Sequence, residues 1–367
     1  MNRLDLGPMF RRFAEKETPN SPLYQAICNA VAVAPDVSSL LHNAPVTQRV
    51  PNLLLAAVHS GLLDVHATCP PSDPLDGLAA FYPSVGGTRD VHDGDGAGAA
   101  FVEFCRSHRD ELEPIIASRS TQTNEVGRSS ALWPVLAGIA AERGPLDLLE
   151  VGASAGLNLL LDRWAYEDVD GNALPGGDPT SPVRLRAKHL GTRPTDPSLP
   201  IARRRGLDRN PLDARDPVAA RWLLACMWPD ELDRFRRTEA ALRFAASGPD
   251  VQIVLGDAVD DLTRVIDNPN VAHLTIVTTW VLSYLEPVRR AEFVAILDRL
   301  GANRDLTWVL AESPMYSADL PWPDNVDAPR GETQLVVIAY RDGCRTATLR
   351  AVMHPHGRWI KWQEPTR

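Results

Sequence analysis

The sequence has few cysteines, no excess of basic residues and no long apolar run. Its five cysteines are widely scattered and form no C-x-x-C or Cys/His cluster, so neither a zinc motif nor a disulfide framework is predicted. The net charge of −9 argues against binding nucleic acid by neutralising phosphates. No run is long enough to cross a bilayer, and the first residues lack the apolar core of a signal peptide. We therefore expect a soluble, cytoplasmic protein with no metal, nucleic-acid partner or membrane partner.

The length of 367 residues allows one large α/β domain and an accessory region. Helical patterns dominate residues 1–142, and no convincing strand precedes Leu146. Ser21 and Pro22 are typical of a helix start, and Ser129 to Arg143 is the last helix of this region. We predict a helical N-terminal or lid region over 1–142 and an α/β domain over 143–367, with an insertion at about 165–200.

From Leu146 onward, apolar runs that predict strands alternate with helical patterns such as Val259 to Ile266, and a short strand is predicted over Val183 to Ala187 within the insertion. Alternation of this kind predicts a mostly parallel sheet covered by helices. Two further runs, joined at Arg341-Asp342-Gly343, predict a terminal antiparallel hairpin. The predicted parallel strands are 146–150, 201–208, 251–257, 274–280 and 306–311, and the hairpin strands are 333–340 and 344–353.

The most informative motif is Glu150-x-Gly152-x-Ser154-x-Gly156, which joins the first strand to the amphipathic segment Leu157 to Trp164. Glycine lets the backbone turn sharply and come close to a ligand. A helix that begins near Ala155 would direct unpaired N–H groups and a positive dipole end at that ligand. The pattern predicts the nucleotide-binding turn of an α/β unit.

Two families share this motif. It resembles the first motif of class I S-adenosylmethionine (SAM) methyltransferases, with Ser154 in place of the middle glycine. Gly152-x-Ser154-x-Gly156 also fits the nucleophile elbow of α/β-hydrolases. In that fold several strands normally precede the elbow, which counts against it here. The dinucleotide pattern G-x-G-x-x-G fits less well, because Ser154 and Leu157 interrupt it.

Acidic residues end three of the predicted parallel strands. Ligands of open α/β sheets bind beyond the carboxyl ends of the strands, where carboxylates can accept hydrogen bonds from hydroxyl and amino groups. By resemblance to the methyltransferases, Glu150 faces the amino-acid end of SAM, Asp208 binds the ribose and Asp257 meets the adenine amine. Each acid alone also fits a helix cap or a turn.

Ser154 has three interpretations: a small residue that begins the helix, a cofactor contact, or a nucleophile. A nucleophile needs a histidine downstream, and the candidates are His273, His354 and His356. A surface or turn histidine is the simpler interpretation of each.

Two further segments are candidates for binding a substrate. Asn124, Glu125 and Arg128 precede the helix that leads to the first strand, and we expect them to line the pocket, with Arg128 or Asn124 meeting a carboxylate. Trp280 and Tyr284 follow the fourth parallel strand, where methyltransferases commonly place the target atom. The alternatives are that the first group only opens a helix and that Trp280 belongs to the core.

Several stretches together resemble a family of uncharacterised bacterial proteins, domain of unknown function 2332. The resemblance covers nearly the whole chain, and it implies a class I methyltransferase-like, Rossmann-type domain behind a helical N-terminal region. It implies no substrate. The stretches are Phe81 to Gly87, Gln122 to Arg128, Leu148 to Trp164, Arg209 to Asp213, Gly256 to Ala258 and Ser283 to Leu285.

The sequence therefore predicts a SAM-dependent methyltransferase that acts on a small molecule, with the N-terminal region over the pocket. Methyl transfer is a direct displacement that depends mainly on alignment, so no single catalytic residue is predicted. A non-catalytic nucleotide-binding or partner-binding protein on the same fold, and a hydrolase that uses Ser154, remain alternatives. The oligomeric state is not predicted.

Overall fold

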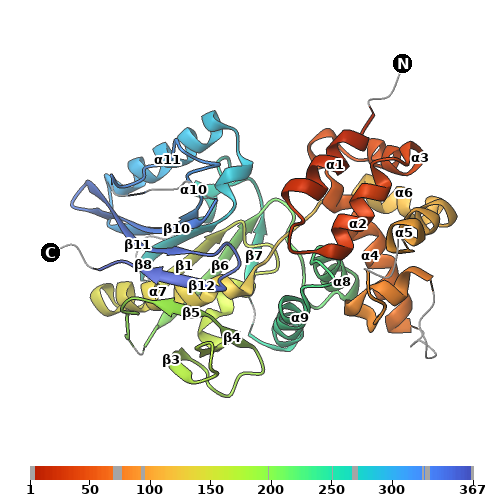
Figure 1. Cartoon of the computed structure of the whole chain (residues 1–367). Helices are drawn as coiled ribbons and strands as arrows, with labels where there is room; N and C mark the ends of the chain where they lie inside the picture. Colours follow the sequence, from red (N-terminus) through yellow and green to blue (C-terminus); the bar gives the residue numbers. More distant parts are fainter. Residues whose placement is uncertain are drawn as a thin grey trace. The chain divides into compact units, whose positions relative to one another are not determined.

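The computed structural model describes residues 5–68, 77–91, 96–196, 198–249, 251–266, 272–324, 326 and 331–364. These residues form two compact units (Figure 1). Unit 1 comprises residues 1–123 and 216–239, and unit 2 comprises residues 124–215 and 240–367. Cys69 lies outside the described residues, and the other four cysteines are free thiols. Within the described residues, no helix has the length and apolar character needed to cross a membrane.

The described part of unit 1 is helical throughout. Ser21 Oγ accepts a hydrogen bond from the Tyr24 N–H at 3.2 Å, which confirms the predicted cap of the second helix. In α4, the run Leu53 to Val58 is buried on every side, so this helix is the centre of the unit. The elements are α1 (Gly7–Lys16), α2 (Pro22–Val31), α3 (Pro35–Ser38), η1 (Ser39–Asn43), η2 (Val46–Gln48), α4 (Pro51–Thr68), η3 (Gly77–Phe81), η4 (Pro83–Val85), α5 (Gly96–Ser107), α6 (Arg109–Ser118), α8 (Pro217–Ala225) and the first half of α9 (Leu232–Ser247).

Unit 2 is built on a nine-stranded sheet with the strand order β5-β12-β11-β10-β9-β8-β1-β6-β7. A second sheet has three strands, in the order β3-β2-β4. The strands are β1 (Leu146–Val151), β2 (Ala165–Glu167), β3 (Ala173–Gly177), β4 (Arg184–Arg186), β5 (Lys188–Leu190), β6 (Ile201–Asp208), β7 (Gln252–Leu255), β8 (His273–Thr279), β9 (Leu306–Glu312), β10 (Thr333–Arg341), β11 (Cys344–Met353) and β12 (Trp359–Trp362).

The five strands β7, β6, β1, β8 and β9 run parallel, as the sequence predicts. Every residue of β1 and of β9 is buried, which is typical of parallel strands with both faces covered. The chain proceeds from β1 outward to β6 and β7, and then returns to the other side of β1 with β8 and β9. The order therefore reverses between β1 and β8. Open α/β sheets bind ligands outside the carboxyl ends of the strands at such a point.

The antiparallel end of the sheet contains the predicted hairpin and two strands that were not predicted. β10 pairs antiparallel with both β9 and β11, and the β10–β11 turn has left-handed φ values at Asp342 (49°) and Gly343 (75°). β12 and β5 extend this edge. The insertion at about 165–200 forms the small sheet and β5, and the short strand predicted near residues 183–187 is β4.

The helices of unit 2 differ from the prediction in two places. The segment after the glycine turn is a short 3₁₀ helix, η6 (Leu157–Arg163), with residues 157–161 all buried, and not an amphipathic α-helix. The helix predicted over 259–266 is the four-residue α10 (Leu262–Val265). The remaining helices are η5 (Val126–Arg128), α7 (Ser129–Arg143), η7 (Leu282–Tyr284) and α11 (Pro287–Gly301).

Candidate functional site

The glycine turn after β1 has left-handed backbone conformations at three positions. The φ values are 79° at Gly152, 52° at Ser154 and 71° at Gly156. Ser154 therefore adopts a left-handed backbone conformation that favours glycine, at a cost of about 1–3 kcal/mol. The Gly152 N–H donates to the Leu207 carbonyl of β6 at 2.8 Å, which fixes the turn against the neighbouring strand.

The missing Cβ atoms of the turn make room for neighbouring side chains of the protein. A Cβ on Gly152 would lie 2.6 Å from Cγ2 of Val281, which follows β8. A Cβ on Gly156 would lie 3.1 Å from side-chain atoms of Ile253 and Val251. The left-handed glycines confirm the predicted sharp turn. Its close neighbours are β7 with the residue before it, and the segment after β8.

We expect Gly152→Ala to destabilise the protein through two separable effects. The left-handed φ strains an alanine by about 1–2 kcal/mol, and the contact with Val281 adds about 1–3 kcal/mol of overpacking. Gly343→Ala is the matched control, because Gly343 has a φ of 75° and open space around its Cβ position. Urea unfolding should show the larger loss for Gly152→Ala, and Val281→Ala should recover part of it. Equal losses of stability in Gly152→Ala and Gly343→Ala would contradict the role of Gly152 in packing against Val281.

Glu150 is fully buried at the end of β1 and belongs to a chain of side-chain hydrogen bonds. Its Oε1 accepts from Asn158 Nδ2 at 3.0 Å, and Asn158 Oδ1 accepts from Ser129 Oγ at 3.1 Å. Among the described residues, Glu150 Oε2 has no hydrogen-bond partner. Burial raises the pKa of Glu150 to about 8, against the opposing effects of Asn158 and the Arg128 charge. A buried carboxyl group with one unused oxygen is a typical feature of a functional site.

Asp208 ends β6 beside the glycine turn. Its Oδ2 accepts from the Ser154 N–H at 2.8 Å, and its Oδ1 accepts from the Asn210 N–H at 2.7 Å. The pairing of β1 with β6 sets Glu150 opposite Gly206, two residues before Asp208. The two acids therefore lie at the carboxyl ends of neighbouring strands. Each Asp208 oxygen keeps a further lone pair that a ligand hydroxyl could use.

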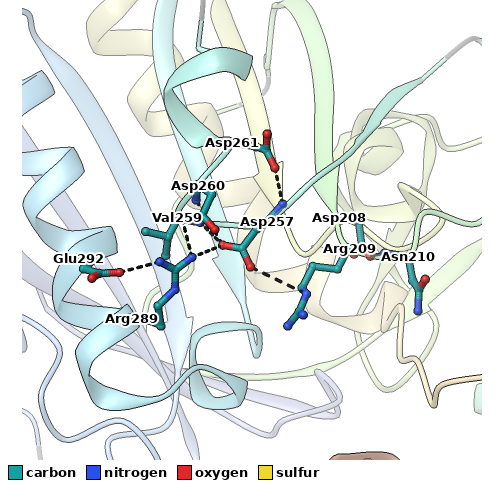
Figure 2. A network of polar contacts seen from close by, with 9 residues as sticks. All are labelled: Asp208, Arg209, Asn210, Asp257, Val259, Asp260, Asp261, Arg289 and Glu292. Atoms are coloured by element: carbon teal, nitrogen blue, oxygen red, sulfur yellow. Dashed lines mark hydrogen bonds and ion pairs between the residues drawn. The ribbon is translucent and has the colours of Figure 1, made fainter. Parts of the chain in front are cut away.

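Asp257 follows β7, the next strand of the sheet, and Figure 2 shows its polar contacts. Its Oδ1 accepts from the Val259 N–H and the Arg289 side chain, both at 2.8 Å, and Arg209 Nε lies 3.8 Å from its Oδ2. Partial burial raises the pKa of Asp257, but the backbone N–H groups of Val259 and Asp260 and the Arg289 side chain hold it below its usual range. Asp257 is therefore ionised at neutral pH, and it stabilises the turn after β7 as well as reaching the edge where Asp208 lies.

Asn124, Glu125 and Arg128 are buried and join three loops at the same edge of the sheet. Asn124 Oδ1 accepts from the Leu157 N–H, just after the glycine turn, at 3.0 Å. Arg128 donates to the Thr279 carbonyl at the end of β8 at 3.2 Å and to the Pro355 carbonyl at 2.9 Å. Both side chains thus bind backbone groups of the protein. The Asn124 amide and the Arg128 guanidinium connect the loops in this way.

The loop 354–357 also meets this segment through Glu125. Glu125 Oε1 accepts from the Gly127 N–H at 3.0 Å, and Glu125 Oε2 lies 3.3 Å from His356 Nδ1. A Cβ on Gly357 would overlap the Gly127 carbonyl, so the two segments pack backbone to backbone. Two of the three candidate histidines therefore lie on this loop, while His273 begins β8 at the opposite, amino end of the sheet, beside Thr307.

The segment after β8 carries the two predicted aromatic residues. Trp280 has a φ of 54°, and its Nε1 donates to Thr333 Oγ1 at 2.7 Å. Its ring lies 5.8 Å from the ring of Tyr316. Tyr284 is 81% exposed, so its side chain is available to a substrate. Trp280 is anchored, and Tyr284 is not part of the core.

Glu312 was not predicted as a site residue, although it ends the fifth parallel strand as Glu150 ends the first. It is fully buried, and its Oε1 accepts from the N–H groups of Val281 and Leu282 at 2.7 and 2.9 Å. Burial raises its pKa, and within the described chain its Oε2 has no hydrogen-bond partner. The rule that selected Glu150, Asp208 and Asp257 also selects Glu312, because all four lie at the carboxyl edge of the parallel strands.

In the described part of the chain, no group of three or more histidine, cysteine or acidic residues is arranged to hold a metal ion. Comparison with curated proteins and with solved structures finds no match. A family model described as an uncharacterised protein conserved in bacteria, domain of unknown function 2332, matches residues 8–362. The match spans most of both units, so the chain belongs to this family of bacterial proteins.

Proposed function

We propose that the protein is a SAM-dependent methyltransferase that acts on a small molecule. The observation that carries the proposal is the common edge of β1, β6 and β7. There, Glu150, Asp208 and Asp257 lie at the ends of three neighbouring parallel strands beside a left-handed turn, and β1 borders the point where strand order reverses. This is a general binding position for nucleotide-type ligands, and acids at the ends of three neighbouring strands suit a ligand with several separate hydrogen-bond donors.

The residues at this edge fit the functional groups of SAM. The unused Oε2 of Glu150 suits the cationic amino end, since a buried carboxyl group becomes more favourably ionised beside a positive charge. Asp208, oriented by two backbone N–H groups, suits the ribose hydroxyls, and Asp257 suits the adenine amine. When bound, SAM would supply an electrophilic methyl group on its sulfonium.

The protein's own contribution to methyl transfer would be alignment and exclusion of water. Glu312 holds the backbone after β8, and Arg128 ties the end of β8 to the loop at Pro355. These contacts position Trp280 and Tyr284, which we propose for acceptor binding. Glu312 and Arg128 are therefore proposed as positioning residues.

Binding of S-adenosylhomocysteine (SAH) tests the proposal. Titration calorimetry should give a saturable isotherm for the full chain, and Glu150→Gln and Asp208→Ala should each weaken binding tenfold or more, since a charge-assisted hydrogen bond contributes about 1.5–3 kcal/mol. Asp36→Asn is the control, because Asp36 pairs with Arg106 on the surface of unit 1. A folded protein that gives no heat with SAH, or acid variants that bind like wild type, would exclude the proposed site.

Transfer of a labelled methyl group to a component of a cell extract separates the enzyme from a non-catalytic binding protein. The serine-hydrolase alternative has one feature in its favour, the strained φ of 52° at Ser154. It stays a prediction, and its test is an esterase activity that disappears in Ser154→Ala.

A further inference from the structure

A serine and a histidine in unit 1 form a direct hydrogen-bonded pair that the proposed methyl transfer does not use. Ser84 Oγ lies 2.8 Å from His59 Nε2. His59 is on α4 and is fully buried, whereas Ser84 is on η4 and is half-buried. A half-buried serine therefore meets a fully buried base.

A third group fixes which nitrogen of His59 carries the proton. His59 Nδ1 lies 3.1 Å from the Ala225 carbonyl oxygen, which can only accept a hydrogen bond. Nδ1 therefore carries the hydrogen, and Nε2 presents its lone pair to the Ser84 hydroxyl. The His59 ring lies 5.5 Å from the ring of Tyr82 and 6.0 Å from the ring of Phe235, and this packing hinders its rotation.

The backbone that carries Ser84 is also fixed. The Gly87 N–H donates to the Tyr82 carbonyl at 2.9 Å, and Gly86 has a left-handed φ of 88°. A Cβ on Gly87 would overlap the carbonyls of Ala79 and Ala80, so this turn packs tightly on η3. A rigid turn presents the Ser84 hydroxyl in one position.

We infer that Ser84 and His59 form a second reactive site, in which Ser84 is an acyl-accepting nucleophile and His59 its general base. The Ser84 hydroxyl is within hydrogen-bond distance of His59, and His59 is within hydrogen-bond distance of the Ala225 carbonyl. A nucleophile, a base and an orienting group connected in this order form the general arrangement of an activated serine. The substrate class is small activated esters. The orienting group is a backbone carbonyl, in the position that an aspartate occupies in a full triad.

The reaction balances with water as the only co-reactant. Ser84 Oγ bonds to the ester carbonyl carbon while its proton moves to His59 Nε2. The bond from that carbon to the alkoxy oxygen breaks, and the leaving alkoxide takes the proton from His59 as an alcohol. Water then attacks the acyl carbon and gives a proton to His59, which returns it to Ser84 Oγ as the carboxylic acid leaves.

Burial affects the range of pH over which His59 can act. It lowers the pKa of His59 to about 4, against the opposing effect of the Ala225 and Met227 backbone. His59 is therefore neutral above about pH 5, and its lone pair is available throughout the neutral range.

Labelling of the full chain with a fluorophosphonate probe tests the inference. The Ser84 peptide should carry the phosphonyl group, and Ser84→Ala, which removes the nucleophile, should carry no phosphonyl group on that peptide. Ser107→Ala is the control, because Ser107 lies at an exposed position at the end of α5, and it should label like wild type. No adduct on Ser84, or equal labelling of wild type and Ser84→Ala, would overturn the inference.

The role of His59 has a separate readout in the wild-type protein, because His59 variants risk misfolding. With a neutral histidine as the base, the labelling rate should be constant between pH 6 and 8. A tenfold rise per pH unit would show that hydroxide, and not His59, activates the serine. SAH binding to Ser84→Ala should equal that of wild type, so the outcome is independent of the methyltransferase proposal.

Discussion

Glu150→Gln should make the protein more stable than wild type at pH 9, by up to about 5 kcal/mol. The pKa of Glu150 rises from about 4.5 to about 8 on burial, and each pKa unit corresponds to about 1.4 kcal/mol. Between these two pH values the folded state keeps a proton that the unfolded state has lost. The contribution of Glu150 to the free energy of unfolding is therefore largest below pH 4.5 and decreases as the pH rises towards 8. Glutamine removes this penalty and can still accept the hydrogen bond from Asn158.

Urea unfolding of wild type and Glu150→Gln at pH 5, 7 and 9 measures the effect. The difference between the two proteins isolates Glu150 from the other titrating groups, Glu312 included. The free energy of unfolding of Glu150→Gln relative to wild type should increase steadily with pH, and the variant should bind SAH more weakly than wild type. Parallel pH profiles would show that Glu150 is not a buried acid with a raised pKa.

Replacing Arg128 by methionine should cost about 2–6 kcal/mol, because two buried carbonyl oxygens lose their donor at about 1–3 kcal/mol each. Arg128 is 5% exposed and donates to the carbonyls of Thr279 and Pro355. Its charge also lowers the pKa of both Glu150 and Glu312. Methionine keeps most of the volume but leaves these carbonyl oxygens without their donor.

Arg106→Met is the matched control, because Arg106 pairs with Asp36 at an exposed position. Urea unfolding at pH 7 should show little change for Arg106→Met and a large loss for Arg128→Met. Arg128→Lys should lie between wild type and Arg128→Met, since lysine keeps the charge but lacks the forked donor geometry. An equal effect of the Arg106 and Arg128 substitutions would contradict the role of Arg128 in joining the loops.

The sequence predicts most of the parallel sheet because its strands are apolar runs that end in acids or turns. β1, β6, β8 and β9 lie within a residue or two of their predicted bounds, and the hairpin turns where predicted. β12 and β5 were not predicted, because four-residue and three-residue strands give too little pattern and their pairing depends on distant segments. The same limit applies to residues 216–239, whose amphipathic helices do not reveal that they belong with unit 1.

At the candidate site, the sequence predicts which residue types lie at the strand ends but not what they contact. The carboxyl-edge rule places Glu150, Asp208 and Asp257 correctly on neighbouring strands. It cannot show that Asn124 meets the Leu157 N–H, or that Glu312 holds the backbone after β8. Those contacts join residues about thirty positions apart and form only in the folded chain.

The most direct measurement is a crystal structure of the full chain grown with SAH. The proposal predicts adenosyl density against residues 152–156, with the ribose at Asp208 and the amino group at Glu150. Density for SAH away from the ends of β1, β6 and β7, or none at a concentration that saturates a known methyltransferase, would contradict it.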